Sequence, residues 1–156
     1  MTIKYVNLNR GVFAPAIVLS ALSRTLAQVH TSPDDRIRIE IAELRSSKGL
    51  VRCSLFSSAQ DFPSRPDKGV ALANGEISNE HAVCEFKGLL PGTYAVSVFH
   101  DENSNGKLDT NFVGIPREGV GASNDAKGHF GPPKFDAAAF QFSGGRLDLK
   151  IKINYF

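Results

Sequence analysis

The sequence predicts an all-β protein with the architecture of an antiparallel β-sandwich of about seven strands. Apolar and polar residues alternate strictly in several short segments, which is typical of strands with one buried face. From residue 36 onward no segment shows the apolar period of a helix, and glycine and proline separate the alternating segments. Two sheets packed face to face bury such strands, so a sandwich is the fold we expect.

The first alternating segments follow one another closely. Residues 36–41 place three isoleucines on one face and charged side chains on the other. Residues 51–55 repeat the pattern after a Ser-Ser-Lys-Gly turn. Further strands are expected at residues 81–86, 93–100 and 137–142.

The last strand has the clearest alternation of the chain. Its apolar side consists of Leu147, Leu149, Ile151, Ile153 and Tyr155. In contrast, residues 61–75 contain two prolines and two glycines, and we expect a loop or an irregular edge there.

Composition bounds the class of protein. With 156 residues, of which 42% are hydrophobic and 22% charged, the chain is suited to one folded domain. The formal net charge is +2, but three of the 18 basic residues and none of the 16 acidic residues lie in the first 27. The remainder carries 15 basic against 16 acidic residues, so we expect no nucleic-acid partner.

The N-terminus has the three parts of a secretory signal peptide. Lys4 and Arg10 precede a mostly apolar run over residues 11–22, and the small residue Ala27 follows. The run is too short to span a bilayer, so we expect no transmembrane segment in the mature chain. An N-terminal helix packed on the domain, or a retained anchor, is the alternative. The predicted division is a signal peptide at residues 1–27, a linker at 28–35 and a single β-sandwich domain at 36–156.

Export places the two cysteines in an oxidising compartment. Cys53 and Cys84 both lie in strand-like segments on the apolar face, where they can form a disulfide between neighbouring strands. Alternatively, both stay buried as free thiols. Their separation and the lack of other cysteines argue against a zinc site.

Residues 103–135 show no sustained strand or helix period. A loop of this length is usually functional or disordered, and its aromatic residues, glycines and prolines favour an ordered path. Two interpretations stay open. The segment is either a flap that covers the end of the sandwich or, mainly over residues 110–135, a binding surface for an unknown ligand or a protein of the cell envelope.

Residues 101–109, Asp-Glu-Asn-Ser-Asn-Gly-Lys-Leu-Asp, have the spacing of a calcium loop. A loop folded around a hard cation presents the oxygens of alternate residues to it, and glycine permits the turn. The predicted ligands are Asp101, Asn103, Asn105, the carbonyl group of Lys107, and Asp109.

This calcium site is expected to be weak, because Phe112 occupies the position of the closing bidentate glutamate. We expect a Kd of roughly 10⁻⁴–10⁻³ M, as in extracellular calcium modules. Glu118, Asp125 or Asp136 can fold back to complete the site, and the sequence does not choose among them. The alternative is a turn in which Asn and Asp side chains bind their own backbone.

His100 precedes Asp101, which raises the question of catalysis. Successive strand residues point to opposite faces, so the two side chains need not meet. The chain also lacks a Gly-x-Ser-x-Gly nucleophile elbow and a glycine-rich phosphate loop. We therefore assign no catalytic residue and predict a non-enzymatic module. A hydrolase using His100 and loop carboxylates, or a purely structural accessory domain, are the alternatives.

Two stretches resemble known families. Residues 86–96, FKGLLPGTYAV, are similar to the F-x-x-L-x-P-G-x-Y-x-V signature of prealbumin-like sandwich modules, which include Cna-B repeats and regulatory domains of carboxypeptidases. The residues that follow resemble the DUF2141 family at positions 100–103, 105–111, 114–116, 118–119, 121, 123–124, 130–133, 135 and 139–140. This resemblance covers roughly residues 36–156 and implies an exported bacterial β-sandwich of unknown function, without an established activity.

Overall fold

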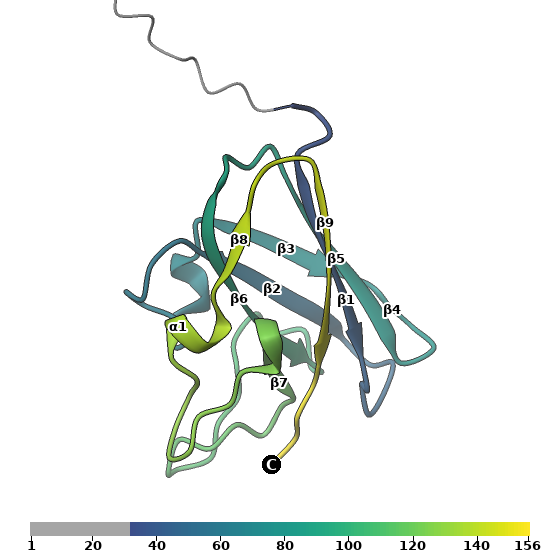
Figure 1. Ribbon diagram of the computed structural model, residues 1–156. Helices are drawn as coiled ribbons and strands as arrows, with labels where there is room; N and C mark the ends of the chain where they lie inside the picture. The colour runs from purple at the N-terminus through teal and green to yellow at the C-terminus, as the bar shows by residue number, and fades with distance from the viewer. Residues whose placement is uncertain (1–31) are drawn as a thin grey trace, which may run out of the picture.

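The structure, a computed structural model, describes residues 32–156 (Figure 1). The predicted all-β sandwich is confirmed, because these residues form two packed sheets with little helix. One sheet has the strand order β4-β5-β1-β9, and the other has the order β3-β2-β6-β7 with β8 also paired to β6. The predicted signal peptide and residues 28–31 of the predicted linker lie outside the described residues.

The strand bounds are as follows. The first sheet contains β4 (Ile77–Ser78), β5 (His81–Lys87), β1 (Arg36–Ala42) and β9 (Arg146–Lys152). The second contains β3 (Ala71–Gly75), β2 (Leu50–Phe56), β6 (Gly92–Asp101), β7 (Val120–Ala122) and β8 (Phe140–Phe142). The helical elements are α1 (Phe135–Ala138) and two 3-10 turns, η1 (Pro66–Lys68) and η2 (Ser123–Asp125).

Several details differ from the sequence prediction. The loop expected over residues 61–75 contains β3, whose Ala, Asn and Gly residues carry little β propensity. The strand expected over residues 137–142 is confined to β8, because α1 extends to Ala138. The short strands β4 and β7 were not predicted, since two or three residues show no period. Finally, β1 and β9 pair in parallel, whereas all other strand pairs are antiparallel as predicted.

The main core lies between the two sheets. The three isoleucines of β1 are completely buried, as their alternation predicts, and the apolar residues of β9 face the same interior. Tyr94, Val96 and Val98 of β6 point into this core from the opposite sheet. The alternation in the sequence therefore predicted the inner faces of both sheets correctly.

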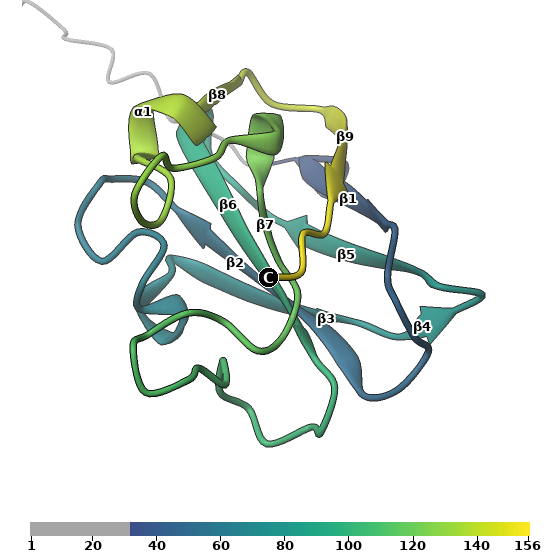
Figure 2. The ribbon, with the colours of Figure 1, turned by 90° about the horizontal axis from the view of Figure 1, so that it is seen from below.

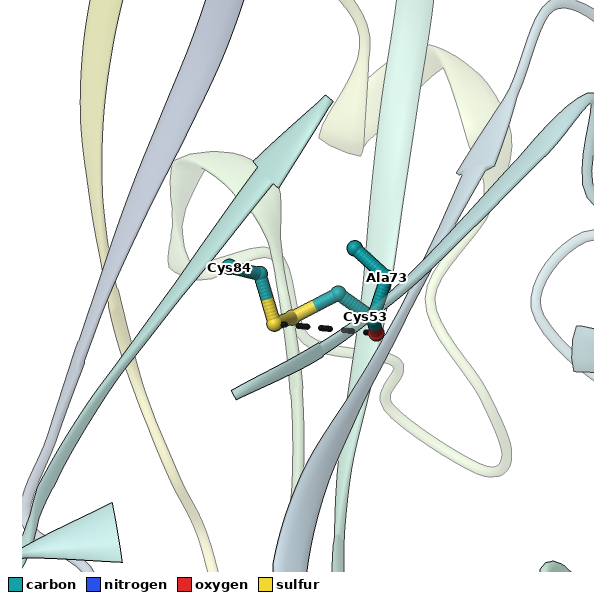
Figure 3. The surroundings of a disulfide bond; sticks show 3 residues. All are labelled: Cys53, Ala73 and Cys84. Carbon is teal, nitrogen blue, oxygen red and sulfur yellow. Dashed lines mark hydrogen bonds between the residues drawn. A yellow bond between two sulfur atoms is a disulfide. The ribbon is translucent and has the colours of Figure 1, made fainter. Parts of the chain in front are cut away.

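The predicted disulfide between Cys53 and Cys84 is present (Figure 3). It does not join two neighbouring strands of one sheet. Cys53 lies on β2 and Cys84 on β5, so the bond connects the two sheets across the core, with the Cα atoms 6.4 Å apart. Both cysteines are almost completely buried. The disulfide therefore acts as a covalent link between the layers.

A second, smaller core covers the outer face of the second sheet. Phe56 at the end of β2 makes an edge-to-face contact with Phe62, which in turn contacts Phe135 of α1 in the same way. Ala95 of β6 and Ala138 of α1 are buried beside them. As a result, β6 has both faces covered, unlike a strand at the surface of a simple two-layer sandwich.

Ser123 and Asn124 attach this outer layer to β6. The edge of β6 pairs with β7 at residues 97–99 and with β8 at residues 92–94, which leaves a gap at Val96. The Ser123 hydroxyl fills the gap, accepting a 2.9 Å hydrogen bond from the Val96 N–H and donating one to the Ala138 carbonyl. The Asn124 side chain donates to the carbonyls on either side of Ala138. Residues 123–124 thus attach a cover to the outer face of the second sheet, whereas the sequence suggested a flap over the end of the sandwich.

The disulfide generates a prediction about stability. Closing a loop across a sequence separation of 31 residues restricts the unfolded chain and corresponds to about 3–4 kcal/mol. We expect reduction to lower the urea midpoint of the wild type accordingly. A double variant, Cys53→Ala with Cys84→Ala, serves as the control, since reductant should not change its midpoint. Equal midpoints of oxidised and reduced wild-type protein would contradict the stabilising role.

Candidate functional site

The loop that follows β6 starts from a buried ion pair. Asp101 lies on the outer face of the second sheet and His100 on the inner face, because successive strand residues point in opposite directions. The Asp101 carboxylate is completely buried, and its Oδ2 accepts a 2.5 Å hydrogen bond from Nε of Arg52 on β2. The loop is therefore anchored to the sheet at its first residue.

Asp101 also holds the first turn of the loop. Its Oδ1 accepts a hydrogen bond from the Asn105 N–H (3.0 Å) and its Oδ2 accepts one from the Gly106 N–H (2.9 Å). Burial by itself raises the pKa of Asp101, but the hydrogen bonds from Arg52 and these two N–H groups outweigh it. The net effect lowers the pKa below its ordinary value of 3.8, so this carboxylate is held in the charged form.

The predicted calcium ligands all lie in this loop, and their side-chain oxygens bind protein donors. Oδ1 of Asn103 accepts the N–H of Asn105 (3.0 Å), and Oδ1 of Asn105 accepts the N–H of Lys107 (2.8 Å). The two carboxylate oxygens of Asp109 accept hydrogen bonds from the side-chain amides of Asn103 and Asn105. These contacts are those of an Asx-rich turn, the alternative that the sequence left open.

The donor set is poorer than that of a strong calcium site. Among residues 32–156, no three His, Cys, Asp or Glu side chains converge as a metal-binding group. Only two of the predicted ligands are carboxylates, Asp101 and Asp109, and the first is already paired with Arg52. Phe112, at the closing position, points into solvent. The geometry fits at most a weak cation site.

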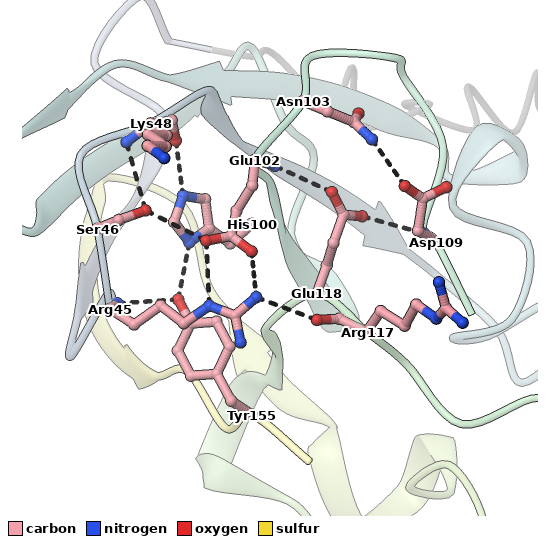
Figure 4. Close-up of polar contacts among 10 residues, drawn as sticks. All are labelled: Arg45, Ser46, Lys48, His100, Glu102, Asn103, Asp109, Arg117, Glu118 and Tyr155. Carbon is pink, nitrogen blue, oxygen red and sulfur yellow. Dashed lines mark hydrogen bonds and ion pairs between the residues drawn. The ribbon is translucent and has the colours of Figure 1, made fainter. Parts of the chain in front are cut away.

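Glu118 closes the loop by binding its backbone at two points. Its carboxylate is buried, and its two oxygens accept 3.0 Å hydrogen bonds from the N–H groups of Glu102 and Asp109 (Figure 4). The side chain thus connects the first residues of the loop to its middle. Asp125, another residue considered as a closing ligand, instead accepts a hydrogen bond from the N–H of Lys152.

His100 is part of a separate buried network on the inner face (Figure 4). Its Nε2 lies 2.8 Å from the Lys48 carbonyl oxygen, which only accepts, so Nε2 carries the proton. Nδ1 then accepts from the Tyr155 hydroxyl at 2.7 Å, and that hydroxyl accepts from the Arg45 N–H. Burial raises the pKa of Tyr155. The structure brings His100 together with Tyr155 and a carbonyl group; Asp101 lies on the opposite face, and Glu118 binds the loop backbone.

Arg45 connects this network to the loop. Its guanidinium group binds both carboxylate oxygens of Glu102 and lies 4.5 Å from the centre of the Tyr155 ring. It also donates to the carbonyl of Arg117 (Figure 4). The Arg45 hydrogen bond lowers the pKa of Glu102, so this pair is charged at neutral pH. Glu102 therefore serves as a brace and is not a ligand of the predicted calcium loop.

The braced loop carries an apolar tip at its far end. The exposed fraction is 98% for Phe112, 63% for Val113 and 46% for Ile115. Asn111 fixes the backbone beneath them, because its Oδ1 accepts the N–H groups of Val113 and Ile115, and its own N–H donates to the Ile115 carbonyl. Gly114 supplies the positive φ of 83° that the turn requires. The backbone of the tip is hydrogen-bonded internally, and this keeps the apolar side chains exposed to solvent.

Two hollows of the surface lie away from this loop. One, of about 400 Å³, lies on the outer face of the first sheet and is lined by residues that include Arg38, Glu40 and His81. The other, of about 380 Å³, lies between Phe62 and the residues 132–136. Both are open and shallow, and neither contains His100 or a predicted calcium ligand.

Sequence reasoning did not find the braces of the loop. Arg45, Arg52 and Tyr155 are 57, 49 and 55 residues away in sequence from their partners Glu102, Asp101 and His100, and no local pattern links them. Arg52 is visible only as an outward charged residue of a predicted strand. Glu118 was considered as a metal ligand, and its role as a backbone acceptor depends on the fold.

Comparison with protein families gives one match. The model of a family described as an uncharacterized protein conserved in bacteria (DUF2141) matches residues 39–150. No curated protein and no solved structure matches the chain.

The role of Glu118 leads to a test by hydrogen exchange. Glu118→Ala leaves the half-buried N–H groups of Glu102 and Asp109 without their acceptor, at a cost of about 1 kcal/mol for each lost hydrogen bond. We expect these two amides to exchange at least tenfold faster, measured by NMR. Glu118→Gln is the matched control, since it keeps one acceptor oxygen and should show a smaller effect. Unchanged exchange in Glu118→Ala would show that the clamp does not hold the loop.

Proposed function

The chain belongs to the bacterial DUF2141 family, and we propose that it is a non-enzymatic binding module that works outside the cytoplasm. In this proposal the tip of the loop over residues 102–118 is the binding surface. The supporting observation is the exposure of Phe112, Val113 and Ile115 on a backbone that is fixed by hydrogen bonds to the Asn111 side chain. Neighbouring apolar side chains held in solvent are typical of interaction sites.

The inter-sheet disulfide supports a location outside the cytoplasm. Disulfides persist in oxidising compartments and are rare in the bacterial cytosol. The proposed signal peptide over residues 1–27, with cleavage after Ala27, provides the route for export to the periplasm or the medium. Within residues 32–156 no helix has the length and hydropathy to cross a membrane.

The environment of His100 supports a role without catalysis. Both ring nitrogens are engaged, one with the Lys48 carbonyl and the other with the Tyr155 hydroxyl, and the side chain has no exposed surface. A general base needs access to a proton of the substrate. A hydrolase that uses His100 with loop carboxylates would require this network to open.

Calcium binding by the loop is a second proposal. The observation that favours it is the state of Asp109, whose carboxylate accepts hydrogen bonds from the side-chain amides of Asn103 and Asn105 and, within residues 32–156, forms no ion pair. Rotation of these amides would present oxygen atoms beside the carboxylate, and Asp101 and the Lys107 carbonyl would complete the set. Such a site would brace the loop further, with the low affinity expected from two carboxylates.

Photocrosslinking in cells tests the binding surface. We expect a photoreactive phenylalanine analogue at position 112 of the full chain to form specific adducts in living bacteria. Leu90 provides the matched control, because it is 47% exposed and lies in the turn before β6, at the opposite end of the sandwich (Figure 1). Adducts from position 112 and none from position 90 would support the proposal. Equal labelling, or none at position 112, would contradict it.

Thermal unfolding tests calcium binding independently. At a calcium concentration tenfold above Kd, binding stabilises the folded state by about 1.4 kcal/mol, so millimolar calcium should raise the Tm of the wild type. Asp109→Asn keeps the shape of the side chain but removes the charge, and we expect no calcium-dependent rise for it. Magnesium serves as the ionic-strength control. A wild-type Tm that calcium leaves unchanged would refute the metal proposal and leave the binding surface unaffected.

A further inference from the structure

We propose that the lower end of the sandwich in Figure 1 docks on an anionic lipid bilayer through two protruding loops. The first is the tip at residues 110–117, and the second is the loop at residues 126–134. This inference rests on the proposed function, because it names the partner of the first loop and adds a second contact to it.

Each loop carries an exposed phenylalanine. In the first loop Phe112 extends into solvent beside Val113. In the second, Phe130 is fully exposed. There the backbone turns so tightly that a Cβ atom on Gly128 would lie 1.9 Å from the carbonyl oxygen of Gly131, so only glycine fits. The turn keeps Phe130 away from the body of the protein.

The two loops extend from the same end of the molecule. Figure 1 shows both below the sheets, at the end where the C-terminus lies. Figure 2 shows them from that end, spread apart and not stacked on each other. Together they form two separate contact points, which suits a flat surface better than a single binding pocket.

The charged residues within the two loops are all basic. Arg117 belongs to the first loop, and Lys127 and Lys134 flank Phe130 in the second. Neither residues 110–117 nor residues 126–134 contain an aspartate or a glutamate. Asp109 and Glu118 border the first loop, where their carboxylates are hydrogen-bonded within residues 102–118, and Asp125 and Asp136 border the second. The loops are thus locally basic, although residues 28–156 as a whole carry slightly more acidic than basic residues.

These cations are also free to bind an external anion. In the described part of the chain no ion pair involves Arg117, Lys127 or Lys134. All other arginines of that part pair with a carboxylate. Arg117, Lys127 and Lys134 thus place unpaired positive charge in the same two loops as the exposed phenylalanines, although Lys48, Lys107 and Lys150 outside these loops are also in no ion pair of the described residues. Anionic lipid headgroups complement the phenylalanines and the basic residues of the two loops.

A bilayer explains these features better than a protein partner does. Aromatic side chains favour the boundary between headgroups and acyl chains, and neighbouring Lys and Arg residues bind the phosphates above it. A protein partner of comparable reach would need a continuous interface, whereas the two apolar points are separated (Figure 2). We expect weak and reversible binding, since only two loops insert.

Vesicle sedimentation tests the proposal with protein purified from cells that express the full chain. We expect it to sediment with phosphatidylcholine vesicles that contain phosphatidylglycerol, and much less with phosphatidylcholine alone. Phe112→Ser and Phe130→Ser should each weaken binding roughly tenfold, as expected for loss of one inserted aromatic side chain. Lys127→Gln with Lys134→Gln should reduce the dependence on phosphatidylglycerol and on salt. Leu90→Ser, at the opposite end, should bind like the wild type.

A tryptophan probe reports insertion directly, since the chain contains no tryptophan. We expect the emission of Phe112→Trp and of Phe130→Trp to shift to shorter wavelength with anionic vesicles, and that of Leu90→Trp to stay unchanged. Equal vesicle binding of the wild type and both serine variants, or no blue shift at either loop, would overturn the proposal. If the protein does not bind vesicles while position 112 crosslinks to a protein, the lipid inference is wrong and the proposed binding module stands. If the protein does not bind vesicles and position 112 forms no adduct with protein or lipid, both are wrong.

Discussion

The burial of β6 on both faces is the constraint on which this structure depends. Its inner face supplies the main core, and its outer face is covered by α1, Phe62 and the turn at Ser123. Each residue at the C-terminal end of β6 therefore faces either the main core or the outer layer. His100 enters the interior and binds Tyr155, whereas Asp101 enters the outer layer and binds Arg52. The loop starts from a strand that cannot rotate.

The braces of the loop are charged or polar groups whose hydrogen bonds are satisfied. Asp101 and Glu102 are paired with arginines, and Glu118 binds two backbone N–H groups. A buried carboxylate is stable only with such partners, so these contacts fix the loop in one arrangement. The consequence appears at the tip, where apolar side chains stay in water because the backbone beneath them cannot fold back.

The long alternating strands were predictable because each has one buried face and spans several periods, as in β1 and β9. The strands that were missed have other origins. β3 consists of residues with low β propensity and forms the edge of its sheet by pairing with β2. β7 has three residues, which form a strand because they pair with β6. The parallel pairing of β1 with β9 also depends on the path of the whole chain, which local alternation does not encode.

The sequence by itself determined the all-β class, the inner faces of the main strands and the Asx-rich character of residues 101–109, because these follow from local periodicity and residue chemistry. Only the tertiary structure decided which distant side chains meet. It placed Cys53 opposite Cys84, Arg52 on Asp101 and Tyr155 on His100. It also left Phe112 in solvent, since an aromatic residue in a loop looks the same in sequence whether it packs or protrudes. Burial is a property of the assembled layers.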